Sequence, residues 1–222
     1  MQITILANRD LPSNYALNLL TESLSGHSLS IFLSDRVGQQ STRASGLEDL
    51  EILRQTNPDL IITLRYGVIL KNEVIAIPRY GVVNLHSGLL PAYKGLMATF
   101  RAMLAGETII GTTLHYIKDA SIDTGPVIGT TAMEVTPDKS YLWHVLNLYP
   151  AGCDLLTASV QAISGKGSAD AVHQIPGGQY YSFPTDEDLH LFQRAGHRLF
   201  DVGEILEFAS RYIPVRHPDH GS

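Results

Sequence analysis

Short apolar runs alternate with helical patterns over the first two thirds of this 222-residue chain. Six runs rich in β-branched residues are expected to form strands at residues 2–6, 29–33, 59–64, 81–85, 111–117 and 127–135. Between them, leucines recur at helical spacing in residues 14–24 and 45–55. Strands that alternate with helices are typical of βαβ units. The sequence therefore predicts an α/β fold with a Rossmann-like, mostly parallel sheet and helices on both faces.

The last third of the chain has a different pattern of residues. A long helix is expected from about residue 140 to residue 164, with Pro150 as a kink. The segment that follows is rich in turns and aromatic residues, and two short helices with capping residues begin near Thr185 and Asp201. We therefore expect a catalytic domain over residues 1–173 and a carboxy-terminal extension over residues 174–222.

Composition excludes several classes of protein. No apolar run approaches the roughly 20 residues that span a bilayer, and the first residues lack the pattern of a signal peptide, so a cytoplasmic location without membrane contact is expected. The net charge of −6 and the lack of a Lys and Arg cluster argue against nucleic acid as a partner. The single cysteine, Cys153, permits neither an internal disulfide nor a multi-cysteine metal site, and is interpreted as a core residue of a helix.

Two segments invite comparison with nucleotide-binding motifs. The segment SGKGS at residues 164–168 lacks the upstream glycine of a phosphate-binding P-loop. The segment ANRDLPSN at residues 7–14 follows the first strand but lacks the G-x-G-x-x-G pattern of dinucleotide-binding proteins. The sequence therefore implies neither ATP nor a dinucleotide as ligand.

Three polar residues are expected to meet in one crevice. Asn84 and His86 fall at the carboxyl end of a predicted strand, where open α/β sheets collect their ligands, and Asp123 lies in a loop between two further strands. An asparagine N–H can donate to an oxyanion, a charged histidine can stabilise it, and a carboxylate can orient the histidine and relay protons. This trio suits attack on a carbonyl carbon without a covalent nucleophile.

Other interpretations of the same residues remain open. Ser87 lies beside His86, but no G-x-S-x-G elbow of a serine hydrolase surrounds it. His86, His115 and Asp123 could ligate a metal, but His115 alternates along its strand and is expected to face a sheet surface, so no metal is expected. Asn84 and His86 could also simply satisfy loop backbone at a strand end. The loop GLLPAYKG at residues 88–95, with its glycines and proline, favours a shaped pocket instead.

A set of spaced motifs resembles the folate-dependent formyltransferase family. That family includes the glycinamide ribonucleotide, methionyl-tRNA and sugar N-formyltransferases and the formyltetrahydrofolate deformylases. The shared pattern comprises Asn84 and His86, Leu-Leu-Pro at 89–91, Lys-Gly at 94–95, Gly-x-Thr-x-His at 111–115 and Asp-x-Gly at 123–125. Order and spacing match over about residues 55 to 135, except that the interval from Gly111 to Asp123 is one residue longer than in the family pattern.

The resemblance implies a donor and a set of contacts. The donor would be 10-formyltetrahydrofolate, and Asn84, His86 and Asp123 would be the catalytic residues that help an amine attack its formyl carbon. The pterin ring would lie between two loops, with contacts from Tyr66, Gly67, Val68, Ile69, Leu70, Lys118, Asp119 and Ile122. Contacts with the second substrate are expected from Asn8, Arg9, Ser87, Gly88 and Tyr180.

Departures from the family pattern bear on the amine acceptor. The chain lacks the glycine-rich phosphate loop of the ribonucleotide enzymes, and no acid precedes Leu148-Tyr149-Pro150 in the late helix. The extension is too short and too acidic to serve as the basic domain of the tRNA enzymes. We therefore expect a small-molecule amine: an amino sugar, an amino acid derivative or a biosynthetic intermediate. A deformylase that uses water, a non-catalytic folate-binding protein, and a homodimer contact through the tail remain alternatives. Tyr180, Tyr181 and Phe183 would line the acceptor pocket or pack on the core.

Overall fold

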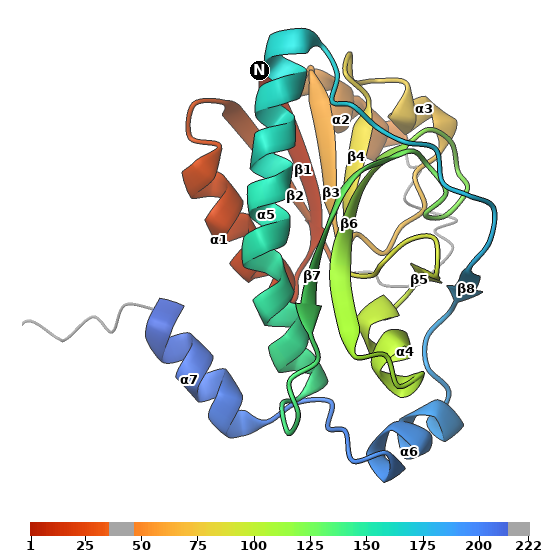
Figure 1. The fold of residues 1–222 in the computed structure, drawn as a ribbon. Helices are drawn as coiled ribbons and strands as arrows, with labels where there is room; N and C mark the ends of the chain where they lie inside the picture. Colours follow the sequence, from red (N-terminus) through yellow and green to blue (C-terminus); the bar gives the residue numbers. More distant parts are fainter. Residues whose placement is uncertain (36–46, 213–222) are drawn as a thin grey trace, which may run out of the picture.

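The computed structural model describes residues 1–35 and 47–212 (Figure 1). Its strands are β1 (Gln2–Asn8), β2 (Ser28–Ser34), β3 (Leu60–Leu64), β4 (Val82–His86), β5 (Tyr93–Gly95), β6 (Ile109–Ile117), β7 (Val127–Glu134) and β8 (Gln179–Tyr181). Its helices are α1 (Leu11–Ser23), α2 (Leu47–Gln55), α3 (Asn72–Ile75), α4 (Ala98–Leu104), α5 (Tyr141–Lys166), α6 (Asp186–Arg194) and α7 (Val202–Tyr212). The six predicted strands and the predicted helices are confirmed, with small shifts at their ends.

Six of the strands form one mixed sheet in the order β2-β1-β3-β4-β6-β7. Strands β1 to β4 pair in parallel, whereas β6 runs antiparallel to β4 and β7 runs antiparallel to β6. Strand β3 is buried at every position, as a central parallel strand must be when helices cover both faces. The predicted α/β fold with a mostly parallel sheet is therefore confirmed.

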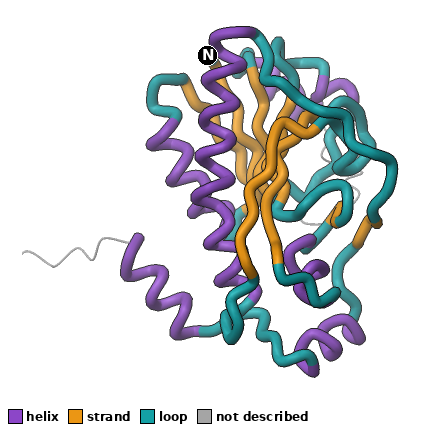
Figure 2. The backbone as a smooth tube through the Cα atoms, viewed as in Figure 1, coloured by secondary structure: helices purple, strands orange, loops and turns teal. Residues whose placement is uncertain are grey.

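Helices cover both faces of the sheet (Figure 2). Helices α1 and α5 lie on one face, and Ile62 and Leu85 point into the large core between them and the strands. On the other face, Leu53 of α2 packs in a smaller cluster with Ile61 and Val82. Because side chains alternate along a strand, Asn84 lies on the same face of β4 as Val82. The face that carries the smaller cluster is therefore also the face that carries the polar residues.

Helix α5 has the ends that its sequence predicts. Ser140 caps its first turn by accepting a hydrogen bond from the Trp143 N–H at 3.2 Å, and Gly167 ends it at a φ of 83°. Pro150 lies inside the helix. Cys153 is 3% exposed and belongs to the large core, so its interpretation as a core residue is confirmed.

Four short elements were not expected from the sequence. They are α3, α4, β5 and β8. Strands β5 and β8 pair in parallel with each other although 83 residues separate Gly95 from Gln179. Elements of three to seven residues carry too short a pattern for periodicity to reveal them, and the strands β5 and β8 also depend on a distant partner.

Aromatic residues fasten the extension to the rest of the molecule. Phe192 of α6 is fully buried, and its ring stacks on Phe100 of α4 at 4.4 Å between centroids. Tyr181 stacks on Tyr93 at 6.0 Å. Tyr180 and Phe183 remain 52% and 44% exposed, so core packing accounts for only part of the aromatic segment.

Within residues 1–35 and 47–212, no helix is both long and apolar enough to cross a membrane.

The burial of Phe192 yields a stability prediction. We expect Phe192→Ala to lower the free energy of unfolding by about 3–5 kcal/mol, because it removes a ring from the main core. Phe200→Ala is the matched control, since Phe200 is 59% exposed, and it should change the free energy by less than about 0.5 kcal/mol. Urea unfolding of both variants measures the difference, and equal effects would show that α6 is not part of the core.

Candidate active site

Asn84, His86 and Asp123 meet on one face of the sheet. Asn84 and His86 end β4, and Asp123 arrives from the loop between β6 and β7 with a φ of 54°. The two oxygens of its carboxylate face different partners. Oδ2 lies 3.6 Å from His86 Nδ1, and Oδ1 lies 3.4 Å from Asn84 Nδ2. The structure therefore brings together the three residues that the sequence singled out.

His115 is a fourth member of this cluster. Its Nε2 lies 3.3 Å from Asp123 Oδ1 and 3.1 Å from Asn84 Nδ2, and the residue is 1% exposed. Sequence reasoning assigned His115 to a sheet surface and gave it no role in the expected trio. The antiparallel pairing of β4 and β6 sets His115 directly opposite Asn84, so that surface is the one that carries the site. The pairing of two strands cannot be read from either strand alone.

Carbonyl partners fix which ring nitrogens carry hydrogen. His86 Nε2 lies 2.8 Å from the Tyr93 carbonyl and His115 Nδ1 lies 3.0 Å from the Tyr116 carbonyl, so both nitrogens must donate. The other nitrogen of each ring therefore faces Asp123. Thr63 Oγ1 donates to Asn84 Oδ1 at 2.8 Å, which turns the Asn84 NH2 group toward the carboxylate. Thr63 is a supporting residue that sequence reasoning missed.

The carboxylate of Asp123 is buried but well paired. Its side chain is 9% exposed, and Oδ2 accepts a hydrogen bond of 2.7 Å from the Gly95 N–H. Burial by itself raises the pKa of Asp123, but His86, His115 and the Gly95 N–H outweigh burial and hold that pKa well below its usual range. Asp123 is therefore ionised at neutral pH and presents a negative charge to both imidazole rings.

Two glycines let the backbone reach these positions. A Cβ on Gly125 would lie 1.7 Å from the Tyr116 carbonyl oxygen, so the turn after Asp123 approaches β6 more closely than any side chain allows. Gly95 has a φ of 90°, and a Cβ there would lie 2.2 Å from the Tyr181 carbonyl oxygen. The Asp-x-Gly and Lys-Gly motifs therefore have a steric basis.

The residues expected at the pterin ring differ in exposure. Ile69 is apolar and 45% exposed, whereas Leu70 is 8% exposed in the smaller core cluster. Tyr66, Gly67, Val68 and Ile122 are partly buried. Lys118 and Asp119 are exposed. The Lys118 ammonium lies 4.5 Å from the centre of the Tyr116 ring, and Asp119 Oδ1 accepts a hydrogen bond from the Ser121 N–H at 2.7 Å.

The residues expected at the acceptor also have structural partners. Asn8 is 2% exposed, and its side-chain oxygen accepts from the Gly67 N–H at 3.4 Å. The Arg9 side chain is 62% exposed and pairs with Asp35 at 3.6 Å. Asn8 therefore ties two loops together, while Arg9 lies at the surface.

Ser87 and Gly88 support the loop that follows β4. The Ser87 carbonyl accepts from Thr99 Oγ1 at 2.7 Å, and the Gly88 carbonyl accepts from Thr113 Oγ1 at 2.7 Å. Both contacts fix the backbone directly after His86.

An ion pair that the sequence did not reveal joins the loops after β1 and β3. Arg65 Nε lies 2.9 Å from Asp10 Oδ2, and both side chains are only partly exposed. Asp10 also caps α1 by accepting from the Ser13 N–H at 2.8 Å. Burial raises the pKa of Asp10, but Arg65 and Ser13 lower it below its ordinary value. Asp10 lies in the segment after β1 that lacks the glycine-rich pattern of a phosphate loop.

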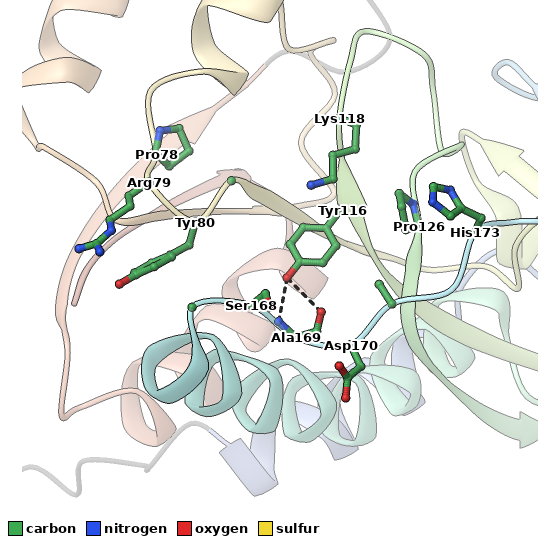
Figure 3. A pocket seen from close by; sticks show the side chains of 13 residues that line it. Pro78, Arg79, Tyr80, Tyr116, Lys118, Pro126, Ser168, Ala169, Asp170 and His173 are labelled. Carbon is green, nitrogen blue, oxygen red and sulfur yellow. Dashed lines mark hydrogen bonds between the residues drawn. The ribbon is translucent and has the colours of Figure 1, made fainter.

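A cavity of about 600 Å³ lies away from the trio, beyond the carboxy-terminal end of α5 (Figure 3). Its walls include Tyr80, Tyr116, Lys118 and Ala169. Within the described ranges, no group of three histidine, cysteine or acidic side chains is arranged to hold a metal ion. Burial raises the pKa of Cys153 to about 12, so its thiol is not a nucleophile at neutral pH.

The fold and the site define a class: a Rossmann-like α/β domain whose sheet carries a buried cluster of asparagine, histidine and aspartate. A family model described as formyl transferase matches residues 25–142, more than half of the chain. The chain belongs to the formyl transferase family, and the resemblance seen in its motifs is confirmed.

Individual relatives extend the comparison. The methionyl-tRNA formyltransferase of Halorhodospira halophila is 35% identical over 127 residues, which cover 57% of this chain and 41% of that protein. The chain thus matches less than half of the relative's length. A sugar N-formyltransferase from Shewanella has a TM-score of 0.64 at 14% identity, with 87% of each chain covered. The formyltransferase PseJ from Anoxybacillus kamchatkensis has a TM-score of 0.62 at 18% identity, with 91% of this chain and 97% of that chain covered. These two structures share the fold.

The close approach at Gly125 yields a second prediction. We expect Gly125→Ala to destabilise the protein by about 1–3 kcal/mol, because the added methyl group overlaps the Tyr116 carbonyl. Gly165→Ala is the control: a methyl group there meets no atom within 4 Å, and alanine favours the helix by up to about 1 kcal/mol. Thermal and urea unfolding would show opposite signs for the two variants. Equal signs would contradict the steric argument.

The charge on Asp123 yields a third prediction. Because its pKa is lower in the folded than in the unfolded protein, ionised Asp123 stabilises the fold above about pH 4, its unfolded value. That contribution is lost as the pH falls through the lower folded value. The gap in unfolding free energy between wild type and Asp123→Asn should therefore be widest above about pH 5 and shrink in acid. Urea titrations at a series of pH values test this, and a gap that grows in acid would refute it.

Proposed function

We propose that this protein is an N-formyltransferase that moves the formyl group of 10-formyltetrahydrofolate to an amine. The observation that carries this proposal is the geometry of Asn84, His86 and Asp123, which places two donors beside one buried carboxylate. Family membership supports it, and PseJ is described in complex with tetrahydrofolate. All three residues lie within residues 1–173, the proposed catalytic domain.

The exposed parts of the two loops fit a flat heterocycle. Ile69 offers an apolar surface that is 45% exposed, and Ile122 lies one residue before Asp123. The backbone of residues 66–68 is anchored through the Asn8–Gly67 hydrogen bond. We propose these loops, from Tyr66 to Leu70 and from Lys118 to Ile122, as the folate contacts. When bound, the folate supplies a formyl group on a nitrogen that can leave.

The chain's own residues then have separate tasks. Asn84 Nδ2 donates toward the formyl oxygen and, together with His86, stabilises the negative charge that develops there. The amine nitrogen forms a bond to the formyl carbon, the bond to the folate nitrogen breaks, and the proton lost by the amine is balanced by one gained at the folate nitrogen. A carboxylate with so low a pKa is a weak base, so Asp123 chiefly orients His86.

We propose that the acceptor is a small-molecule amine. The partly buried Asp10–Arg65 pair lies after β1, in the segment that lacks the pattern of a phosphate loop. The Shewanella neighbour is described as a sugar N-formyltransferase, and PseJ is described with a formamido sugar nucleotide. The relative from Halorhodospira halophila favours a second candidate, methionyl-tRNA. We propose contacts with the acceptor from Asn8, Arg9, Ser87, Gly88 and Tyr180.

A transfer assay tests the proposed activity. The protein is incubated with 10-formyltetrahydrofolate and a panel of amino sugars, amine-bearing sugar nucleotides, amino acid derivatives and methionyl-tRNA. Tetrahydrofolate release and product mass are followed together. We expect amine-dependent turnover, with a small molecule as the best acceptor. Formate released at one rate with or without amine would instead identify a hydrolase, and methionyl-tRNA as the best acceptor would overturn the small-molecule assignment.

Substitutions at the trio give the fourth prediction. Asn84→Ala and His86→Ala should each lower kcat by roughly 100- to 1,000-fold, because each removes a polar group that stabilises the developing charge. His190→Ala is the control, since His190 is an exposed histidine on α6. If His86→Ala changes neither turnover nor folate affinity, His86 is not catalytic. Binding of folate without any turnover in the wild type would indicate a non-catalytic folate-binding protein.

A further inference from the structure

The segment between α5 and β8 sends one side chain to the turn that holds Asp123. Gln174 Nε2 donates to the Asp123 carbonyl at 2.9 Å and to the Gly125 carbonyl at 2.8 Å. One NH2 group thus spends both of its hydrogens on two carbonyls of the same turn. Gln174 does not touch the carboxylate itself. It holds the backbone from which the carboxylate projects.

The chemistry of the turn fixes the orientation of the Gln174 amide. Two carbonyl oxygens can only accept, so the NH2 group must face them and the amide oxygen must point away. That oxygen, Oε1, is buried and accepts no hydrogen bond from a residue within the described ranges. An orphaned buried acceptor is unfavourable. The two hydrogen bonds to the turn therefore fix the amide in an orientation that leaves its own oxygen without a hydrogen bond from the described residues.

The same segment is anchored independently of Gln174. Val172 and Val127 exchange two backbone hydrogen bonds, each of 2.8 Å. The Tyr116 hydroxyl accepts from the Ala169 N–H at 3.0 Å, beside the cavity of about 600 Å³ (Figure 3). The segment would stay in place without the side chain of Gln174. The side chain of Gln174 adds two hydrogen bonds to the backbone of the Asp123 turn.

The backbone of the Asp123 turn has an unfavourable conformation that hydrogen bonds must stabilise. Asp123 has a left-handed φ of 54°, a conformation that L-residues with a side chain rarely adopt. Its carboxylate must meet the Gly95 N–H and the His115 ring at the same time. A small rotation of the turn would move the carboxylate away from one of these partners.

We propose that Gln174 is a positioning residue that sets the Asp123 carboxylate against His86 and His115 through the backbone of the turn. The geometric part concerns the protein alone. The catalytic part rests on the proposed formyl transfer.

The geometric part is tested without any substrate. In NMR spectra of histidine-labelled protein, the ring nitrogens of His86 and His115 report the distance to the Asp123 charge. We expect Gln174→Met, which keeps length but removes both donors, to shift both sets of signals in the direction that Asp123→Asn shifts them. Gln161→Met, at an exposed glutamine of α5, should leave them unchanged.

A second variant separates lost donors from lost packing. Gln174→Glu keeps the shape but sets a carboxylate against the two carbonyls, so its shifts should exceed those of Gln174→Met at neutral pH. They should shrink in acid, where a protonated Glu regains one donor. If signals of His86 and His115 in both variants match the wild type, the proposal is overturned. Shifts in Gln174→Met that are absent from the equally shaped Gln174→Glu would assign the effect to packing and also overturn the proposal.

The catalytic part is tested with the transfer assay. Gln174→Met should lower kcat by up to about 100-fold while the KM for 10-formyltetrahydrofolate and the melting temperature change little. A rise in KM at constant kcat would contradict the positioning role. If the wild type lacks transferase activity altogether, the proposed function fails, whereas the NMR result still decides whether Gln174 positions Asp123.

Discussion

The buried carboxylate of Asp123 is the constraint on which the rest of the site depends. A charge that is 9% exposed must be paired and hydrogen-bonded, because an isolated one would be severely unfavourable. Its partners are Asn84 from β4, His115 from β6 and the N–H of Gly95 in β5, with His86 facing it at 3.6 Å. One side chain therefore draws three separate strands into a fixed arrangement. The arrangement places Asn84 and His86 on the same side of the sheet.

Backbone geometry follows from that constraint. To deliver the carboxylate, the turn after β6 must fold back over its own strand, which requires the close approach at Gly125 and the left-handed backbone at Asp123. Strand β5 must present an N–H at the matching place, and its pairing with β8 holds it there. The site thus lies partly on loops. These loops are held in place by the sheet, by the pairing of β5 with β8, and by the hydrogen bonds from Gln174.

The donor side and the acceptor side of the proposed reaction differ in how strongly the structure defines them. Groups that would act on a formyl carbon are buried or partly buried and are held by hydrogen bonds, and charge interacts more strongly there than in water. The region after β1 instead holds a partly buried ion pair between Asp10 and Arg65. A reaction shared by a family requires the same catalytic groups in the same arrangement. The acceptor that each member uses depends on the loops around those groups.

The sequence by itself determined the main-sheet strands, the longer helices and the three residues Asn84, His86 and Asp123. Apolar periodicity marked the six strands of the main sheet, and the capping residues Thr185 and Asp201 marked helix starts, because both signals are local. Only the tertiary structure decided that His115 joins the site, that β5 pairs with β8, and that Gln174 holds the Asp123 turn. Each of these contacts joins residues at least 8 positions apart, and Gln174 lies 51 positions from Asp123. Such contacts depend on which strands pair and on which loops lie side by side in the fold. Neither property produces a periodic pattern in the sequence.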